Sequence, residues 1–65
     1  MKNVQPAMNV GKQRRKLIAL LPTADTNQKR EYVFHLIGLF DAAVEDGQPQ
    51  PASQFIPMYE EEFDL

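Results

Sequence analysis

The sequence predicts an all-α protein in which a short helix and a long helix form an antiparallel hairpin. Apolar residues recur at helical spacing over residues 10–20 and again over residues 26–46, which is typical of two amphipathic helices. Pro22 separates the two runs, because the residue before a proline is disfavoured in the α-helical conformation. Gly47 follows the second run and favours a helix end. The chain then has three parts: a flexible basic arm (1–9), the helical hairpin (10–47), and a proline-containing linker with an acidic-hydrophobic tail (48–65).

Residues able to cap a helix precede both expected helices. Asn9 stands directly before the first helix, where its side-chain oxygen can accept a hydrogen bond from a free backbone N–H. Asp25 precedes the second helix, and Gln28 three residues later completes the pattern of a reciprocal capping box. We therefore expect Asn9 and Asp25 to be the two N-caps.

The long helix carries an apolar stripe that the short helix is too short to cover. Neighbouring apolar residues widen this stripe beyond the face of an ordinary surface helix. In a hairpin with the shorter helix, Phe40, Ala43 and Val44 would stay bare. A 65-residue chain also has a small core, which association can supplement. We therefore expect a homodimer with an interface formed by Val33, Ile37, Phe40 and Val44.

The C-terminal segment is expected to be extended and to bind a partner. Pro49 and Pro51 favour a polyproline-type linker, and Pro57 argues against a continuous helix beyond it. Acidic and bulky apolar residues are interleaved here, as in disordered tails that fold on a partner. The candidate anchors are Phe55, Ile56, Met58, Tyr59, Phe63 and Leu65. The alternative is that residues 55–59 fold back over the bare end of the long helix.

Charge is strongly polarised along the chain. Residues 1–30 hold all seven Lys and Arg and one acid, a net charge of +6, whereas residues 31–65 hold the other eight acids, a net charge of −8. The two ends can attract each other, a second copy or two different partners. The densest basic run is either a candidate contact for nucleic-acid phosphates or a solvated helix face. It consists of Lys12, Arg14, Arg15 and Lys16.

Four charges of the long helix oppose its dipole. Lys29 and Arg30 lie in its expected first turn, and Glu45 and Asp46 lie in its last turn, the reverse of the favourable arrangement. These charges therefore serve either solubility or a partner surface.

Two single residues of the long helix allow two interpretations each. Gly38 is in mid-helix, where glycine costs about 1 kcal/mol relative to alanine. It marks either the close approach of another backbone or a tolerated loss. His35 lies on the more polar side of the helix, as either an exposed side chain or a pH-sensitive contact.

No catalytic or metal-binding set can be assembled from the sequence. The chain has no Cys, one His and Ser53 as its only serine, which excludes thiolate metal sites and leaves no nucleophile with a nearby base. The acids at positions 60–62 fall in the expected mobile tail, where a preorganised acid–base pair does not form. We therefore expect no enzymatic activity, no cofactor and no metal.

These observations favour a small non-enzymatic interaction protein, a regulator or inhibitor of the kind that phage and mobile elements encode, which binds another protein. One alternative is a dimeric, antitoxin-like DNA-binding transcriptional regulator. A ribbon–helix–helix arrangement would need a strand over residues 3–10, where Pro6 and the lack of alternation disfavour it. A further alternative is an accessory subunit of a larger complex. No apolar run reaches the length of a membrane span and no signal peptide is recognisable, so we expect a cytoplasmic protein with no membrane contact.

Overall fold

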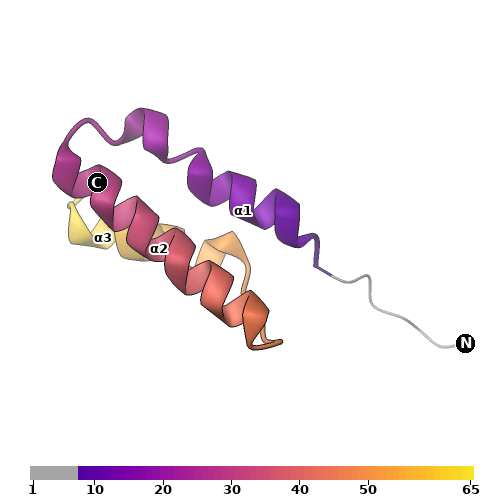
Figure 1. Cartoon of the computed structure of the whole chain (residues 1–65). Helices are drawn as coiled ribbons and strands as arrows, with labels where there is room; N and C mark the ends of the chain where they lie inside the picture. Colours follow the sequence, from indigo (N-terminus) through magenta and orange to yellow (C-terminus); the bar gives the residue numbers. More distant parts are fainter. Residues whose placement is uncertain (1–7) are drawn as a thin grey trace, which may run out of the picture.

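The computed structural model describes residues 8–65, and over this range the protein is all-helical, as predicted (Figure 1). The elements in chain order are α1 (Val10–Ile18), the 3-10 helix η1 (Leu21–Thr23), α2 (Asn27–Glu45), the 3-10 helix η2 (Ala52–Gln54) and α3 (Ile56–Glu62). No strand occurs within this range. Most of the predicted basic arm, residues 1–7, lies outside the described residues.

The predicted pairing of a short and a long helix is confirmed. α1 and α2 pack against each other, and Figure 1 shows them side by side, joined at one end by the connection through η1. Arg14 of α1 binds Asp41 near the far end of α2, with Nε–Oδ1 2.9 Å and Nη2–Oδ2 3.0 Å. This two-bonded pair spans 27 residues of sequence and fixes the two helices in opposite directions.

The two N-caps agree with the sequence prediction in one case only. Asn9 caps α1, because its Oδ1 accepts a hydrogen bond from the backbone N–H of Lys12 at 2.9 Å. The prediction of Asp25 as the second cap is wrong. Thr26 caps α2 through a hydrogen bond from the Lys29 N–H to Thr26 Oγ1 at 3.1 Å. The capping residue must stand immediately before the first helical residue, and α2 begins one residue later than that prediction requires.

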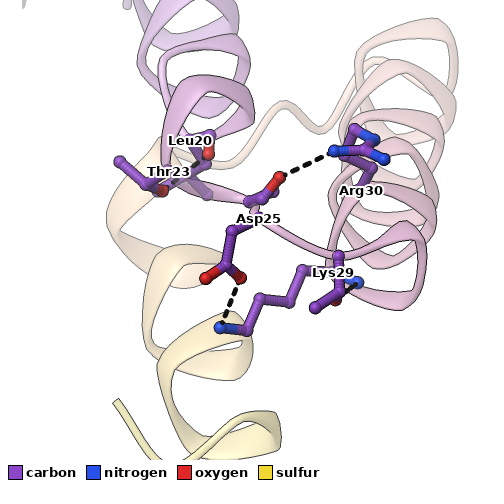
Figure 2. A network of polar contacts seen from close by, with 7 residues as sticks. Leu20, Thr23, Asp25, Lys29 and Arg30 are labelled. Carbon is purple, nitrogen blue, oxygen red and sulfur yellow. Dashed lines mark hydrogen bonds and ion pairs between the residues drawn. The ribbon is translucent and has the colours of Figure 1, made fainter.

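The charges at the start of α2 hold the connection between α1 and α2 (Figure 2). Lys29 Nζ donates to Asp25 Oδ1 at 3.0 Å, and Arg30 Nη1 donates to the backbone oxygen of Ala24 at 3.0 Å. Thr23 Oγ1 donates to the backbone oxygen of Leu20 at 2.7 Å within the same connection. The two cations oppose the helix dipole, but Arg30 satisfies a backbone oxygen of the connection and Lys29 pairs with an exposed carboxylate in it.

A single core is shared by all three helices and both 3-10 segments. α1 contributes one buried side chain and α2 contributes four, and the rest come from the connections and α3. The buried residues are Leu17, Ala24, Val33, Leu36, Ile37, Phe40, Ala52, Phe55 and Tyr59. η2 is tied to α1 by a hydrogen bond from the Ala52 N–H to Gln13 Oε1 at 2.8 Å.

The predicted dimer interface lies inside this single-chain core. Val33, Ile37 and Phe40 are buried and Val44 is half-buried without a second copy. The Phe55 ring packs edge-on against Phe40, with 6.0 Å between the ring centroids. The premise that the end of α2 is bare is therefore wrong, because the C-terminal segment covers it. Dimerisation itself stays a prediction.

The expectation of an extended C-terminal segment is also wrong over residues 56–62, which form α3. Pro57 does not prevent this helix, because it lies in the first turn. A proline there lacks only an N–H that has no helical partner in any case, and its fixed φ suits the helix. The alternative that residues 55–59 fold back over α2 is the one that the structure shows.

Gly47 is required by the backbone at the end of α2, whereas Gly38 in the middle of the helix is not. Gly47 ends the helix as predicted, with φ at 77°. The N–H groups of Gly47 and Gln48 donate to the oxygens of Val44 and Ala43 at 3.0 and 2.9 Å, the hydrogen-bond pattern of a Schellman motif. Gly38 is exposed, and a Cβ added there would meet nothing within 4 Å. No backbone of the described residues therefore approaches Gly38 closely.

Substituting alanine at these two glycines should shift stability in opposite directions. Gly38→Ala should raise the free energy of unfolding by about 1 kcal/mol, because alanine favours the helix and has space. Gly47→Ala should lower it by about 1–2 kcal/mol, because a Cβ is strained in the left-handed conformation. Urea denaturation of both variants beside the wild type tests the pair. Equal effects of the same sign would contradict this account of α2 and its end.

Candidate functional site

The six tail residues predicted to anchor a partner divide between core and surface. Phe55 and Tyr59 are buried, and Ile56 and Phe63 are half-buried against the core. Met58 and Leu65 remain exposed, with 42% and 66% of their surface accessible. The structure therefore leaves two of the six exposed to another molecule and uses the others mainly for folding.

The outward side of α3 is acidic with apolar side chains in its midst. Its buried side holds Tyr59, while Met58 projects away from the core. All the acids of the segment are exposed and none forms an ion pair within residues 8–65. We call this surface the α3 acidic face; it consists of Met58, Glu60, Glu61, Glu62, Asp64 and Leu65.

The segment beyond α3 is held in a defined turn. Asp64 takes a left-handed conformation with φ at 55°, which aspartate tolerates better than most residues. The N–H groups of Leu65 and Asp64 donate to the oxygens of Glu60 and Glu61 at 2.8 and 3.4 Å. Because these bonds cap the free carbonyls of α3, the α3 acidic face extends to the last residue described.

The four residues of the basic run are separated by the fold. Arg14 reaches α2 and is bound to Asp41, and both side chains stay exposed. Lys12, Arg15 and Lys16 are exposed and form no ion pair within the described part of the chain. The exposed cations of α1 without an ion pair are therefore these three, and their spacing of three and four residues places them on one face of the helix.

The two internal ion pairs shift the titration of their carboxyl groups. The hydrogen bond from Arg14 is the main cause of a lowered pKa at Asp41, opposed by slight desolvation and reinforced by charge attraction. The hydrogen bond from Lys29, with its charge, lowers the pKa of Asp25. The same Asp41 contact raises the pKa of Arg14. One cation of α1 and one of α2 are therefore paired within the chain. The charged residues outside these two pairs are the ones available to a partner.

Acid should remove the stability that these pairs contribute. Because the folded-state pKa of both carboxyls is lowered, their contribution is complete above the unfolded value of about 4 and is lost as pH falls through the lowered folded value. Asp41→Asn should therefore be slightly less stable than wild type at pH 7, and its stability should decline less between pH 5 and pH 2. Urea denaturation across this pH range measures both effects. Asp46→Asn, at an exposed acid without a described ion pair, is the matched control and should decline as the wild type does.

An aromatic cluster joins α3 to the first half of α2. Tyr32 lies beside Tyr59 and Phe63, with ring centroids 6.4 and 5.5 Å apart, and Tyr59 and Phe63 are 5.4 Å apart. The ring of His35 also lies beside that of Tyr32, with 5.9 Å between the ring centroids. Tyr59 is only 2% exposed, and its buried hydroxyl has no hydrogen-bond partner among the described residues. The core therefore retains one polar atom at a desolvation cost.

Removing that hydroxyl should stabilise the protein. Tyr59→Phe keeps the ring contacts with Tyr32 and Phe63 and removes a buried oxygen without a partner. The expected gain is about 1 kcal/mol, the lower end of the cost of an unsatisfied buried hydroxyl. This corresponds to a rise of about 4–8 °C in Tm for a domain of this size, measurable by thermal denaturation. A fall in Tm would mean that the hydroxyl makes a stabilising hydrogen bond in solution.

An open pocket of about 360 Å³ lies between the first half of α2 and the end of α3. Its lining combines two carboxylates, an amide, an imidazole and two aromatic rings: Gln28, Glu31, Tyr32, His35, Glu62 and Phe63. No local sequence pattern indicates this pocket. Gln28 and His35 share the polar side of α2, but only the docking of α3 brings Glu62 and Phe63 beside them. We call it the α2–α3 pocket.

No group of three or more His, Asp or Glu residues within the described range is placed to hold a metal ion. Across the same range, no helix is long and apolar enough to cross a membrane.

Comparison with models of protein families, with curated proteins and with solved structures found no match.

Proposed function

We propose that the protein is a small non-enzymatic binding protein, a regulator or inhibitor, that uses the α3 acidic face to bind a basic surface of another protein. The observation that carries this proposal is that α3 and the residue before it have one buried side and one exposed side. Buried Phe55 and Tyr59 fix the helix to the core, while Met58 and the acids stay exposed. An apolar side chain within a charged rim is the composition of a protein-binding surface.

Rigid presentation favours tight binding by this face. Because the acids lie on a packed helix and not on a free tail, less conformational entropy is lost when a partner binds. The acids steer a basic partner toward the face and raise the rate of association. Met58 and Leu65 then supply apolar contact, for which flexible side chains such as methionine are well suited.

Affinity purification from the native host with matched variants tests the proposal. The acidic-face variant is Met58→Gln with Glu60→Gln and Glu61→Gln, and the control variant changes Lys12, Arg15 and Lys16 to Gln. All six positions are exposed, so circular dichroism should show wild-type helicity in both. One stoichiometric protein should be recovered with the wild type and the control variant, and lost with the acidic-face variant. Recovery that depends only on the basic positions would contradict the proposal.

A second candidate function, an antitoxin-like DNA-binding regulator, is favoured by the exposed cations of α1. Lys12, Arg15 and Lys16 are exposed, share one face of α1 by their spacing, and form no ion pair in the described chain. Three phosphate contacts would produce a slope of about −2.7 per copy in log K against log salt concentration. Binding to a random-sequence duplex at several salt concentrations measures this slope, and the triple Gln variant should abolish it. No binding at low salt would eliminate this candidate.

A further inference from the structure

The lining of the α2–α3 pocket is negatively charged and lacks a cation of its own. Glu31 and Glu62 are exposed carboxylates from two different helices, and neither forms an ion pair or side-chain hydrogen bond within residues 8–65. The nearest cations in the sequence, Lys29 and Arg30, are held by Asp25 and by the Ala24 carbonyl oxygen. A positive group entering the pocket would therefore meet two unneutralised charges.

Aromatic rings stand beside these carboxylates. The rings of Tyr32 and Phe63 are perpendicular, with 5.5 Å between their centroids, and the His35 ring lies 5.9 Å from that of Tyr32. All three residues line the pocket. The face of an aromatic ring attracts a cation. A guanidinium group can also stack flat on such a ring while donating two hydrogen bonds to a carboxylate.

The size of the pocket matches a side chain better than a cofactor. About 360 Å³ is near the lower end of the range for small-molecule sites. Two of the aromatic rings that line it, those of Tyr32 and Phe63, are held in place by packing against the buried ring of Tyr59. The pocket is therefore a preformed feature of the α2–α3 contact and is open to a group projecting from another protein.

We infer that the α2–α3 pocket binds the guanidinium group of an arginine side chain presented by the partner protein. Glu31 and Glu62 accept its hydrogen bonds, and its plane stacks on one of the aromatic rings that line the pocket, while the other rings enclose its edge. This inference rests on the proposed binding of a basic protein, because Glu62 belongs both to the pocket and to the α3 acidic face. It adds a specific anchor to a surface that otherwise attracts any basic protein.

A blocked peptide, acetyl-Gly-Arg-Gly-amide, is the probe, and its isosteric citrulline analogue is the uncharged control. Nuclear magnetic resonance titration in physiological salt should show saturable shifts of the ring signals of Tyr32, His35 and Phe63 with the arginine peptide. The citrulline peptide should bind at least tenfold more weakly, because it cannot pair with the carboxylates. A lysine peptide should also bind more weakly, since an ammonium group does not stack or form the two-bonded contact. Equal binding of the arginine and citrulline peptides would overturn the inference, and so would equal binding of the lysine peptide.

Paired variants of the protein separate the pocket from general charge attraction. Glu31→Gln with Glu62→Gln should weaken the arginine peptide at least tenfold, whereas Glu60→Gln with Glu61→Gln removes the same charge outside the pocket and should change it less than twofold. Equal weakening in both variants would overturn the inference. The outcome is separable from that of the proposed function. A partner that binds the Glu31/Glu62 variant as tightly as the wild type, but not the acidic-face variant, would refute the arginine anchor and leave the binding function standing.

Discussion

Replacing Phe40 with alanine should lower the free energy of unfolding by about 3–5 kcal/mol, the cost of removing a fully buried phenylalanine side chain. Phe40 is 0% exposed and its ring packs edge-on against Phe55. A 65-residue domain is typically stable by only about 3–10 kcal/mol. The variant should therefore lose a large part of its stability, and circular dichroism and urea denaturation will measure this loss.

Phe34→Ala is the matched control for this prediction. Phe34 is on the same helix and is 58% exposed, so its removal should change stability by less than about 0.5 kcal/mol. Denaturation at several protein concentrations adds a second criterion. The midpoint should not depend on concentration if Phe40 is buried within one chain, and it should rise with concentration if the core forms only in a dimer. Equal losses in the two variants would contradict the core described here.

The hairpin was predictable because its signals are local. The apolar period, Pro22, the Asn9 cap and the Gly47 stop each act within a few residues, and each is present in the structure. The second N-cap was misassigned by one residue, since Asp25 and Thr26 are both good caps. Only the backbone decides which of them stands at the helix start.

The packing of the C-terminal segment was the main feature that the sequence could not decide. Pro57 alone predicts a break in a helix, although proline is well tolerated in a first turn. Whether Pro57 falls in a first turn depends on where α3 starts, and α3 starts directly after Phe55, whose ring packs against Phe40. This contact is between segments distant in sequence, and no local pattern encodes it. The expectation of a dimer has the same cause: without the contact of Phe55 with Phe40, the end of α2 would need a second copy to cover it.

The candidate site was only partly predictable for a related reason. Charge separation along the chain pointed to acids and apolar residues near the C-terminus, and Met58 and Leu65 remain exposed among them. The pairing of Arg14 with Asp41 removes one cation from the basic run. The α2–α3 pocket depends on which side of α3 faces α2, so Glu31 and Glu62 could not be associated from spacing alone.

Truncation after Pro51 should abolish cooperative folding. The deletion removes Ala52, Phe55 and Tyr59, three buried residues of the core, and with them the ring of Phe55 that packs against Phe40. Each of the two aromatic side chains would cost about 3–5 kcal/mol if cut to alanine alone, so their joint loss matches or exceeds the stability expected of this domain. The helical circular dichroism signal should fall sharply, and urea should no longer produce a sigmoidal transition.

A chain ending at Phe63 is the control for this truncation, because it lacks only exposed Asp64 and Leu65 and keeps every buried side chain. It should unfold cooperatively, with a loss limited to the hydrogen bonds that Leu65 and Asp64 donate to Glu60 and Glu61. The comparison separates the two roles that the sequence assigned to this segment. If the chain ending at Pro51 keeps full helicity and a cooperative transition while losing its partner, the segment is a recognition tail and α3 is not part of the core. If it unfolds while the chain ending at Phe63 does not, α3 completes the fold, because the aromatic side chains that hold it in place are the ones that cover α2.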